Sequence, residues 1–262
     1  MSDRSKVDTV NKSCDSRYVM RCLVKLRSTQ RQSYTSAYHI KLQGLLYQIL
    51  AEAGYEFVHE ENPFKFVTFS NIFPPTDMNE GDRRTWLVAS PHEHLIQKFS
   101  ETIADYDTVS VGEHRYAVEY TSEFELTPEE HAAVETGTPI VVRIPAARCE
   151  SYGIDAEYDD VYWRLEHPTE AFQEEIEQNL ATKYRQYYDR DPPERPYFTD
   201  LAPKKEVAIP LHYDDGVVQT IGTTWELQYD CHTRAEHRLM RLAYSAGLGE
   251  LNTTGFGFIN NA

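Results

Sequence analysis

Hydrophobic positions in the first half of the chain follow the periods of strands and amphipathic helices. Residues 17–27 partly alternate apolar and other side chains, which is typical of a half-buried strand. The segment 34–53 predicts a helix that ends at Gly54. Its apolar face consists of Leu42, Leu45, Leu46, Ile49 and Leu50. The other elements predicted here are strands at 65–69 and 85–89, a helix at 91–104 and further strand at 108–124.

The second half of the chain predicts a similar order of elements after a junction. Thr127-Pro-Glu-Glu130 has the pattern of a capping box and predicts a short helix that ends within 135–139. The elements predicted beyond it are a strand at 139–144, a helix at 168–188, strands at 206–211, 217–221 and 224–229, a helix at 233–246 and a last strand at 256–259.

Both halves fit the order βαββαβ, which is that of ferredoxin-like and RNA-recognition domains. The expected fold class is therefore α+β with two tandem ferredoxin-like domains. We place them at 17–130 and 131–262, after a flexible polar tail at 1–16. The chain contains no internal sequence repeat that would support the duplication independently.

Composition excludes several classes of protein. The 262 residues are 40% hydrophobic, which is enough to form a core. No apolar run reaches the roughly 20 residues of a membrane-spanning helix, and the N-terminus does not have the pattern of a signal peptide. Cys14, Cys22, Cys149 and Cys231 are too widely spaced for a zinc motif or a disulfide framework. We expect a soluble cytoplasmic protein without metal or cofactor.

The formal net charge of −16 argues at first against nucleic-acid binding. Arginine is preferred over lysine, however, and the acids are spread along the chain. This pattern favours a protein from a salt-saturated cytoplasm over an ordinary acidic protein. At about 1 M salt the screening length is only about 3 Å, so distant acids would barely repel RNA.

A glycine-rich segment near the C-terminus is the most specific motif. Two Gly-apolar-Gly triplets, Gly247–Gly249 and Gly255–Gly257, are separated by five residues and lie between a predicted helix and the last strand. Glycine allows positive φ and close approach to a ligand, and backbone N–H groups of such a loop can face a phosphate. The alternative is a helix C-cap followed by a strand glycine.

This segment resembles the C-terminal glycine-rich loop of the CRISPR-associated repeat-RNA endoribonucleases of the RAMP superfamily. Further similar segments follow in the family's order at 37–47, 138–143, 172–184 and 221–227. The resemblance implies a metal-independent enzyme that cleaves CRISPR precursor transcripts within repeats and leaves 2′,3′-cyclic phosphate and 5′-hydroxyl ends. Together with the composition, it suggests a halophilic archaeon as the source. It also implies CRISPR repeat RNA or crRNA as partner, with other subunits of a surveillance complex as further candidates.

The same resemblance implies His39 as the catalytic residue, since it lies in the segment similar to the family's histidine helix. Histidine suits proton transfer because its unperturbed pKa is near neutrality. The alternative is a surface or partly buried helix histidine. Some relatives use a tyrosine and a lysine as well, so Tyr34, Tyr38 and Lys41 are candidate helpers, although none has a matching spacing.

Candidate RNA-binding residues form two groups. The first lies in the glycine-rich segment and consists of Gly247, Gly249, Thr253, Thr254, Gly255 and Gly257. The second is the stripe Arg234, Arg238 and Arg241 on the preceding helix, where arginine would match phosphate geometry. The alternative for this stripe is a solvated helix face. His92 and His94 could begin a metal site but lack clear partners.

Two other functions remain open at this point. A non-catalytic RAMP subunit that binds guide RNA would need the glycine-rich segment but not His39. A metal-dependent nuclease or an unrelated acidic binding module is the third possibility.

Overall fold

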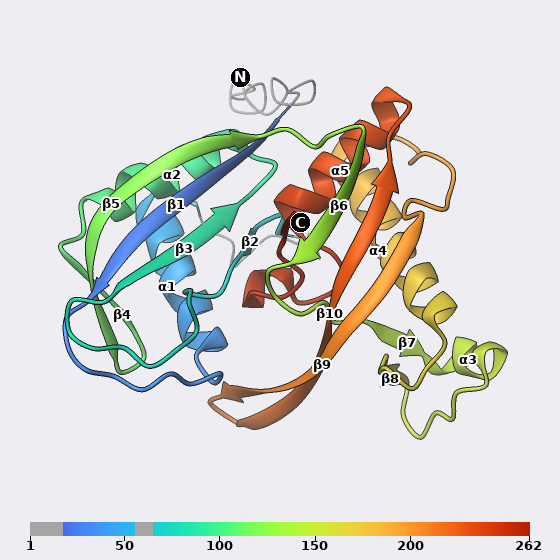
Figure 1. The fold of residues 1–262 in the computed structure, drawn as a ribbon, viewed down its shortest axis with the longest axis horizontal. Coiled ribbons are helices and arrows are strands. Elements are labelled where there is room, and N and C mark those ends of the chain that lie inside the picture. Colours follow the sequence, from blue (N-terminus) through green and yellow to red (C-terminus); the bar gives the residue numbers. More distant parts are fainter. Residues whose placement is uncertain (1–17, 56–64) are drawn as a thin grey trace, which may run out of the picture.

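The computed structural model describes residues 18–55 and 65–262 and has the expected α+β class (Figure 1). Two antiparallel sheets lie side by side, and two helices pack on each of them. The predicted tail at 1–16 lies outside the described residues. No helix in the described ranges is long and apolar enough to cross a membrane.

The first sheet has the strand order β2-β3-β1-β5-β4. Its strands are β1 (Val19–Ser28), β2 (Thr68–Phe69), β3 (Arg83–Ala89), β4 (Thr108–Val111) and β5 (His114–Leu126). The helices α1 (His39–Glu52) and α2 (Glu93–Ala104) bury their apolar faces against it. The order β2-β3-β1-β5 is that of a ferredoxin-like sheet, and the hairpin partner β4 extends it at one edge.

The second sheet has the order β11-β6-β10-β9, again that of a ferredoxin-like unit. Its elements are β6 (His131–Thr136), α4 (Thr169–Tyr188), β9 (Asp200–Tyr213), β10 (Gly216–Asp230), α5 (Arg234–Ala246) and β11 (Ile259–Asn261). A small insertion between β6 and α4 contains β7 (Arg143–Pro145), α3 (Ala146–Cys149), a 3-10 turn (Glu150–Tyr152) and β8 (Asp160–Tyr162).

The first strand of the second unit was predicted at the wrong place. The segment after Thr127–Glu130 is the strand β6, not a short helix, and it pairs with both β10 and β11. Residues 139–144 do not form the sheet's first strand; Ile140 and Val141 make only isolated bridges, and β7 begins at Arg143. Pairing on two sides and burial of Val134 outweigh the local capping pattern.

Two other elements differ from the sequence pattern in extent. The predicted helix 34–53 begins only at His39, so Tyr34 and Tyr38 precede it. The three predicted strands between 206 and 229 are parts of one long hairpin, β9–β10, with a bulge between Thr224 and Trp225. The division of the chain at 130 and 131 stays a proposal; β5 ends at Leu126 and β6 begins at His131.

A buried arginine joins the two units. Arg21 of β1 is 1% exposed, and its guanidinium donates to the carbonyls of Tyr244 and Ile259 and to Oδ1 of Asn260, at 2.7–2.9 Å. It also lies over the ring of Phe258, 4.5 Å from the centroid. Burial lowers its pKa to about 10, which leaves it charged at neutral pH. The first sheet thereby holds the C-terminal segment of the second unit.

Candidate active site

The glycine-rich loop connects α5 to β11 by a path that only glycine adopts readily. Gly247, Gly249, Gly255 and Gly257 have φ values of +80°, +64°, +87° and +68°. These values lie in the left-handed region, where a side chain is strained. Between the two glycine pairs the chain forms a short 3-10 turn, η3 (Asn252–Thr254).

The loop is packed against protein on the sides where these glycines lack a side chain. A Cβ on Gly257 would overlap the carbonyl of Leu248, and one on Gly249 would overlap the carbonyl of Val141. A Cβ on Gly255 would lie 2.6 Å from the ring of Phe69 in β2. The glycines therefore allow the loop to enter the space between the two units.

Most amides of this loop bond within the protein, contrary to the expectation that they face an anion. The N–H groups of Leu248, Glu250, Gly255 and Gly257 donate to the carbonyls of Gly257, Val141, Asn252 and Pro139, respectively. All four glycines are buried. Their contact with RNA stays a prediction, while their role in closing the loop follows from the geometry.

Lys183 of α4 holds the loop from inside. The side chain is 1% exposed, and Nζ donates to the carbonyls of Gly247 and Gly249 and to Oδ1 of Asn252, at 2.6–2.9 Å. Burial lowers its pKa to about 7, and the nearby Glu250 carboxylate acts in the opposite direction. An ammonium group offers three donors, which matches these three acceptors. The sequence showed Lys183 only as part of a helix.

His39 lies against the loop at the first residue of α1. Its Nδ1 is 3.0 Å from the carbonyl oxygen of Thr254, and its ring stacks between Tyr38 and Phe256 with centroids 5.2 and 4.9 Å away. The side chain is 3% exposed. The structure thus brings together the histidine from one unit and the glycine-rich loop from the other.

The Thr254 carbonyl fixes the tautomer of His39. A carbonyl only accepts, so Nδ1 carries the proton and Nε2 of the neutral ring has a free lone pair. Nε2 makes no hydrogen bond within the described residues. It is not fully buried, so it belongs to the small part of the ring that is exposed. Burial lowers the pKa of His39, and the hydrogen bond with Thr254 offsets this effect only in part. The lowered pKa favours the neutral ring, which can act as a base.

Gln43 is a site residue that the sequence did not reveal. It lies one turn after His39, and its Nε2 donates to Oγ1 of Thr254 at 3.2 Å. Residues four apart share a helix face, so the i+4 spacing was the available signal. Thr254 is consequently held by two side chains of α1.

The three candidate helpers lie in different surroundings. Tyr38 is buried in the core of the first unit, and burial raises its pKa, so it is a poor base. Tyr34 is 37% exposed, and its ring lies 6.1 Å from that of Tyr38. Lys41 is exposed, with its stem beside Gly112 of the β4–β5 turn. Two residues after His39, it faces another side of α1.

The arginine stripe runs along α5 toward the glycine-rich loop. Arg234 begins α5 and Gly247 follows its last residue, so about 20 Å of helix separates them. Arg241 borders a small pocket with Tyr18, Ser90 and Tyr187. Thr253 is partly exposed on the loop. The role of these residues in RNA binding stays a prediction.

Metal ligation finds no support in the arrangement of the described side chains. Across residues 18–55 and 65–262, no three His, Cys, Asp or Glu side chains are grouped to hold an ion. Nδ1 of His94 is instead 2.6 Å from the hydroxyl of Tyr55. The ring of His92 packs against Phe66 and Tyr187.

Comparison with known proteins shows which family has this architecture. The model of the family described as "CRISPR associated protein Cas6, C-terminal" matches residues 121–261. A protein of Haloferax mediterranei described as "CRISPR-associated endoribonuclease Cas6" is 32% identical over 92% of this chain and 93% of its own length. A protein of Methanocaldococcus jannaschii described as "CRISPR-associated endoribonuclease Cas6 2" is 28% identical over 92% of this chain and 99% of its own length.

Solved structures share the fold. "An RAMP protein binding different RNA substrates" has a TM-score of 0.70 at 17% identity, and "CRISPR associated protein Cas6" has 0.65 at 19%. Each match covers 93% of this chain and 99% of the other. The fold, with its two ferredoxin-like units, is the one seen in these RAMP and Cas6 structures. The chain belongs to the CRISPR-associated Cas6 family. The relative from halophilic Haloferax is consistent with the acidic, arginine-preferring composition.

We predict that Gly257→Ala destabilises the protein by at least about 2 kcal/mol, because positive φ and overlap with Leu248 both penalise a Cβ. Gly44→Ala is the control: its Cβ would enter open space on α1, and alanine is favoured in a helix by roughly 0.5–1 kcal/mol. Thermal and urea unfolding measure both. Equal stability of the two variants would contradict the packing described for the loop.

A second prediction concerns the clamp on the loop. Lys183→Met should lower stability by about 2–4 kcal/mol, because it leaves three buried acceptors without this donor. Lys98→Met, which removes an exposed lysine paired with Glu101, should change stability far less, because exposed ion pairs contribute little. A Lys183 variant as stable as the Lys98 variant would show that the loop does not depend on this ammonium group.

Proposed function

We propose that this protein is a metal-independent endoribonuclease that cleaves CRISPR precursor transcripts within their repeats to give guide RNAs. The observation that carries the proposal is His39, held by Thr254 with Nε2 as the open ring nitrogen. The names of the relatives from Haloferax and Methanocaldococcus support the substrate class and the reaction.

The chemistry requires only proton transfer and charge stabilisation. Nε2 of neutral His39 takes the proton of the ribose 2′-hydroxyl, whose oxygen attacks the adjacent phosphorus. The bond from phosphorus to the 5′-oxygen breaks, which leaves a 2′,3′-cyclic phosphate and a 5′-hydroxyl. The leaving oxygen needs a proton, and Tyr34 is our candidate donor because it is a partly exposed phenol beside Tyr38, the residue that precedes His39.

RNA has to be held by local groups because the chain carries a net charge of −16. At high salt the distant acids are screened, so hydrogen bonds at the loop gain weight. We propose Thr253 and the glycine-rich segment as contacts close to the cut, and the Arg234, Arg238 and Arg241 stripe as contacts with a more distant part of the transcript.

A non-catalytic subunit that only binds guide RNA is the second candidate. It would share the fold and the loop, and association with other subunits of a surveillance complex would suit either function. The two differ in what His39 does, so a histidine variant separates them.

His39→Ala should reduce single-turnover cleavage of the host's repeat RNA by about 10²–10⁴-fold while RNA affinity changes little, because only proton transfer is lost. His131→Ala is the matched control, since His131 is an exposed histidine paired with Asp230. Cleavage is followed in high salt with EDTA, and the product ends are identified chemically.

Three results would contradict parts of this proposal. Equal cleavage by the wild type and His39→Ala would remove His39 from the mechanism. Loss of wild-type cleavage in EDTA would favour a metal-dependent nuclease. Tight binding without any cleavage by the wild type would favour the guide-RNA-binding subunit.

The pH profile gives an independent prediction. Because burial lowers the pKa of His39 below 6.5, the cleavage rate should rise with pH along a limb centred below pH 6.5 and then level off. The free energy of unfolding should change with pH in the same direction. The His39 ring binds a proton more tightly in the unfolded chain, so His39 lowers stability as pH falls below 6.5. Single-turnover rates between pH 4.5 and 8 test this. A limb centred above 6.5 would mean that another group titrates.

A further inference from the structure

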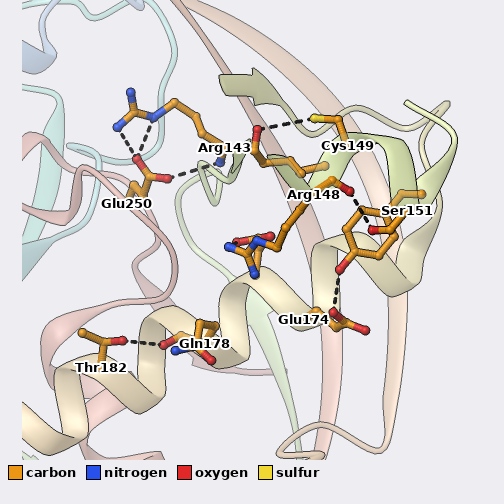
Figure 2. A network of polar contacts seen from close by, with 11 residues as sticks. Arg143, Arg148, Cys149, Ser151, Glu174, Gln178, Thr182 and Glu250 are labelled. Atoms are coloured by element: carbon orange, nitrogen blue, oxygen red, sulfur yellow. Dashed lines mark hydrogen bonds and ion pairs between the residues drawn. The ribbon is translucent and has the colours of Figure 1, made fainter. Parts of the chain in front are cut away.

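A polar cavity of about 250 Å³ lies on the side of the glycine-rich loop that faces the insertion. Its walls are the α4 helix, the β7–α3 segment and the loop residues Gly249 and Glu250 (Figure 2). This volume far exceeds the 10–15 Å³ that a single water requires. The cavity takes no part in the proton transfer assigned to His39.

Two arginines of the insertion form one wall and are held by carboxylates. Nε and Nη2 of Arg143 lie 2.7 and 2.6 Å from Oε2 of Glu250, and Nη1 lies 3.2 Å from Oδ2 of Asp160. Nη2 of Arg148 lies 2.6 Å from Oε2 of Glu175. Figure 2 shows the Arg143–Glu250 pair on the loop side and Arg148 above the α4 helix. Both arginine side chains remain about 40% exposed, so each can make further contacts.

The opposite wall, on α4, has polar atoms without partners. Glu175 is 8% exposed and its Oε1 has no hydrogen-bond partner, and the same is true of Oδ1 of the partly buried Asn179. Within the described residues, the side-chain amide of Gln178 also has no recorded partner. Burial raises the pKa of Glu175, with Arg148 acting against it. A buried acceptor left unpaired costs about 1–3 kcal/mol, and both oxygens have almost no accessible surface. A ligand that brings donors would pair with them once their side chains turn toward the cavity.

We propose that this cavity binds one unpaired nucleotide of the RNA, with a base that carries an amino group. Side-chain amides read base edges, and unpaired RNA bases are recognised on those edges. Adenine, cytosine or guanine would supply the amino donors that Glu175 and Asn179 lack, whereas uracil has no amino group. The arginines match the phosphate.

The surroundings favour a nucleotide in a chain over a small acidic ligand. Glu175 and Glu250 would repel a multiply charged anion, but a nucleotide within RNA brings one phosphate charge and a neutral base. Glu250 lies four residues before Thr254, which contacts His39, so RNA that follows the loop passes both places. The inference rests on the proposed function and adds a specificity site to it.

The test is an abasic scan of the repeat RNA. Each position is replaced in turn by an abasic nucleotide, and the affinity of the wild type, Arg148→Gln and Gln178→Leu is measured. Arg185→Gln is the matched control, because Arg185 lies on α4 outside the cavity, and its ion pair with exposed Asp191 is long, at 3.7 Å. For the wild type, an abasic nucleotide at one position should lower the RNA affinity by about tenfold or more. Uridine at that position should lower the affinity as much if it replaces an amino-bearing base.

The cavity variants should bind wild-type RNA more weakly, but an abasic nucleotide at that position should not lower their affinity further. The reason is that the protein change and the RNA change remove the same contact. The control should keep the wild-type profile. This inference alone would be overturned if the wild type cleaves the repeat but the abasic effect at every position is the same in the wild type and in both cavity variants. A wild type that neither binds nor cleaves repeat RNA would overturn the proposed function and this inference with it.

Discussion

The arrangement of this protein depends on the path of one loop through positive φ. Gly247 and Gly257 allow the chain to close on itself, where the N–H of Leu248 donates to the carbonyl of Gly257. Lys183 holds the closed loop from the core of the second unit. With the loop fixed, Thr254 reaches the first unit and Glu250 reaches the insertion. One backbone constraint thus places both the histidine contact and one wall of the polar cavity.

Several arginines serve the fold before any RNA is bound. Arg21 joins the two units through three hydrogen bonds, while Arg143 and Arg148 are paired with carboxylates around the cavity. In this acidic chain, these three cationic groups are therefore held at defined points. Arginine suits this use because its planar fork stays charged and makes several directed bonds.

Periodicity predicted the four long helices, α1, α2, α4 and α5, and most of the strands, because their apolar faces are local features. The face of α1 and the spacing-four residues of α4 are buried as expected. The strand β6 was missed because its pairing partners, β10 and β11, lie more than 80 residues later in the chain. Resemblance singled out His39, and the i+4 spacing placed Gln43 on the same helix face. The contacts of Gln43 with Thr254 and of Lys183 with the glycine loop join distant parts of the chain, so a local pattern could not reveal them.

The central claim is that the Thr254 carbonyl fixes His39 as a neutral base with Nε2 free. Nitrogen-15 NMR of the imidazole, assigned by the signal missing in His39→Ala, tests this directly. The account predicts the Nδ1–H tautomer at pH 7 and a pKa below 6.5. An Nε2–H tautomer, or a pKa at or above 6.5, would contradict it.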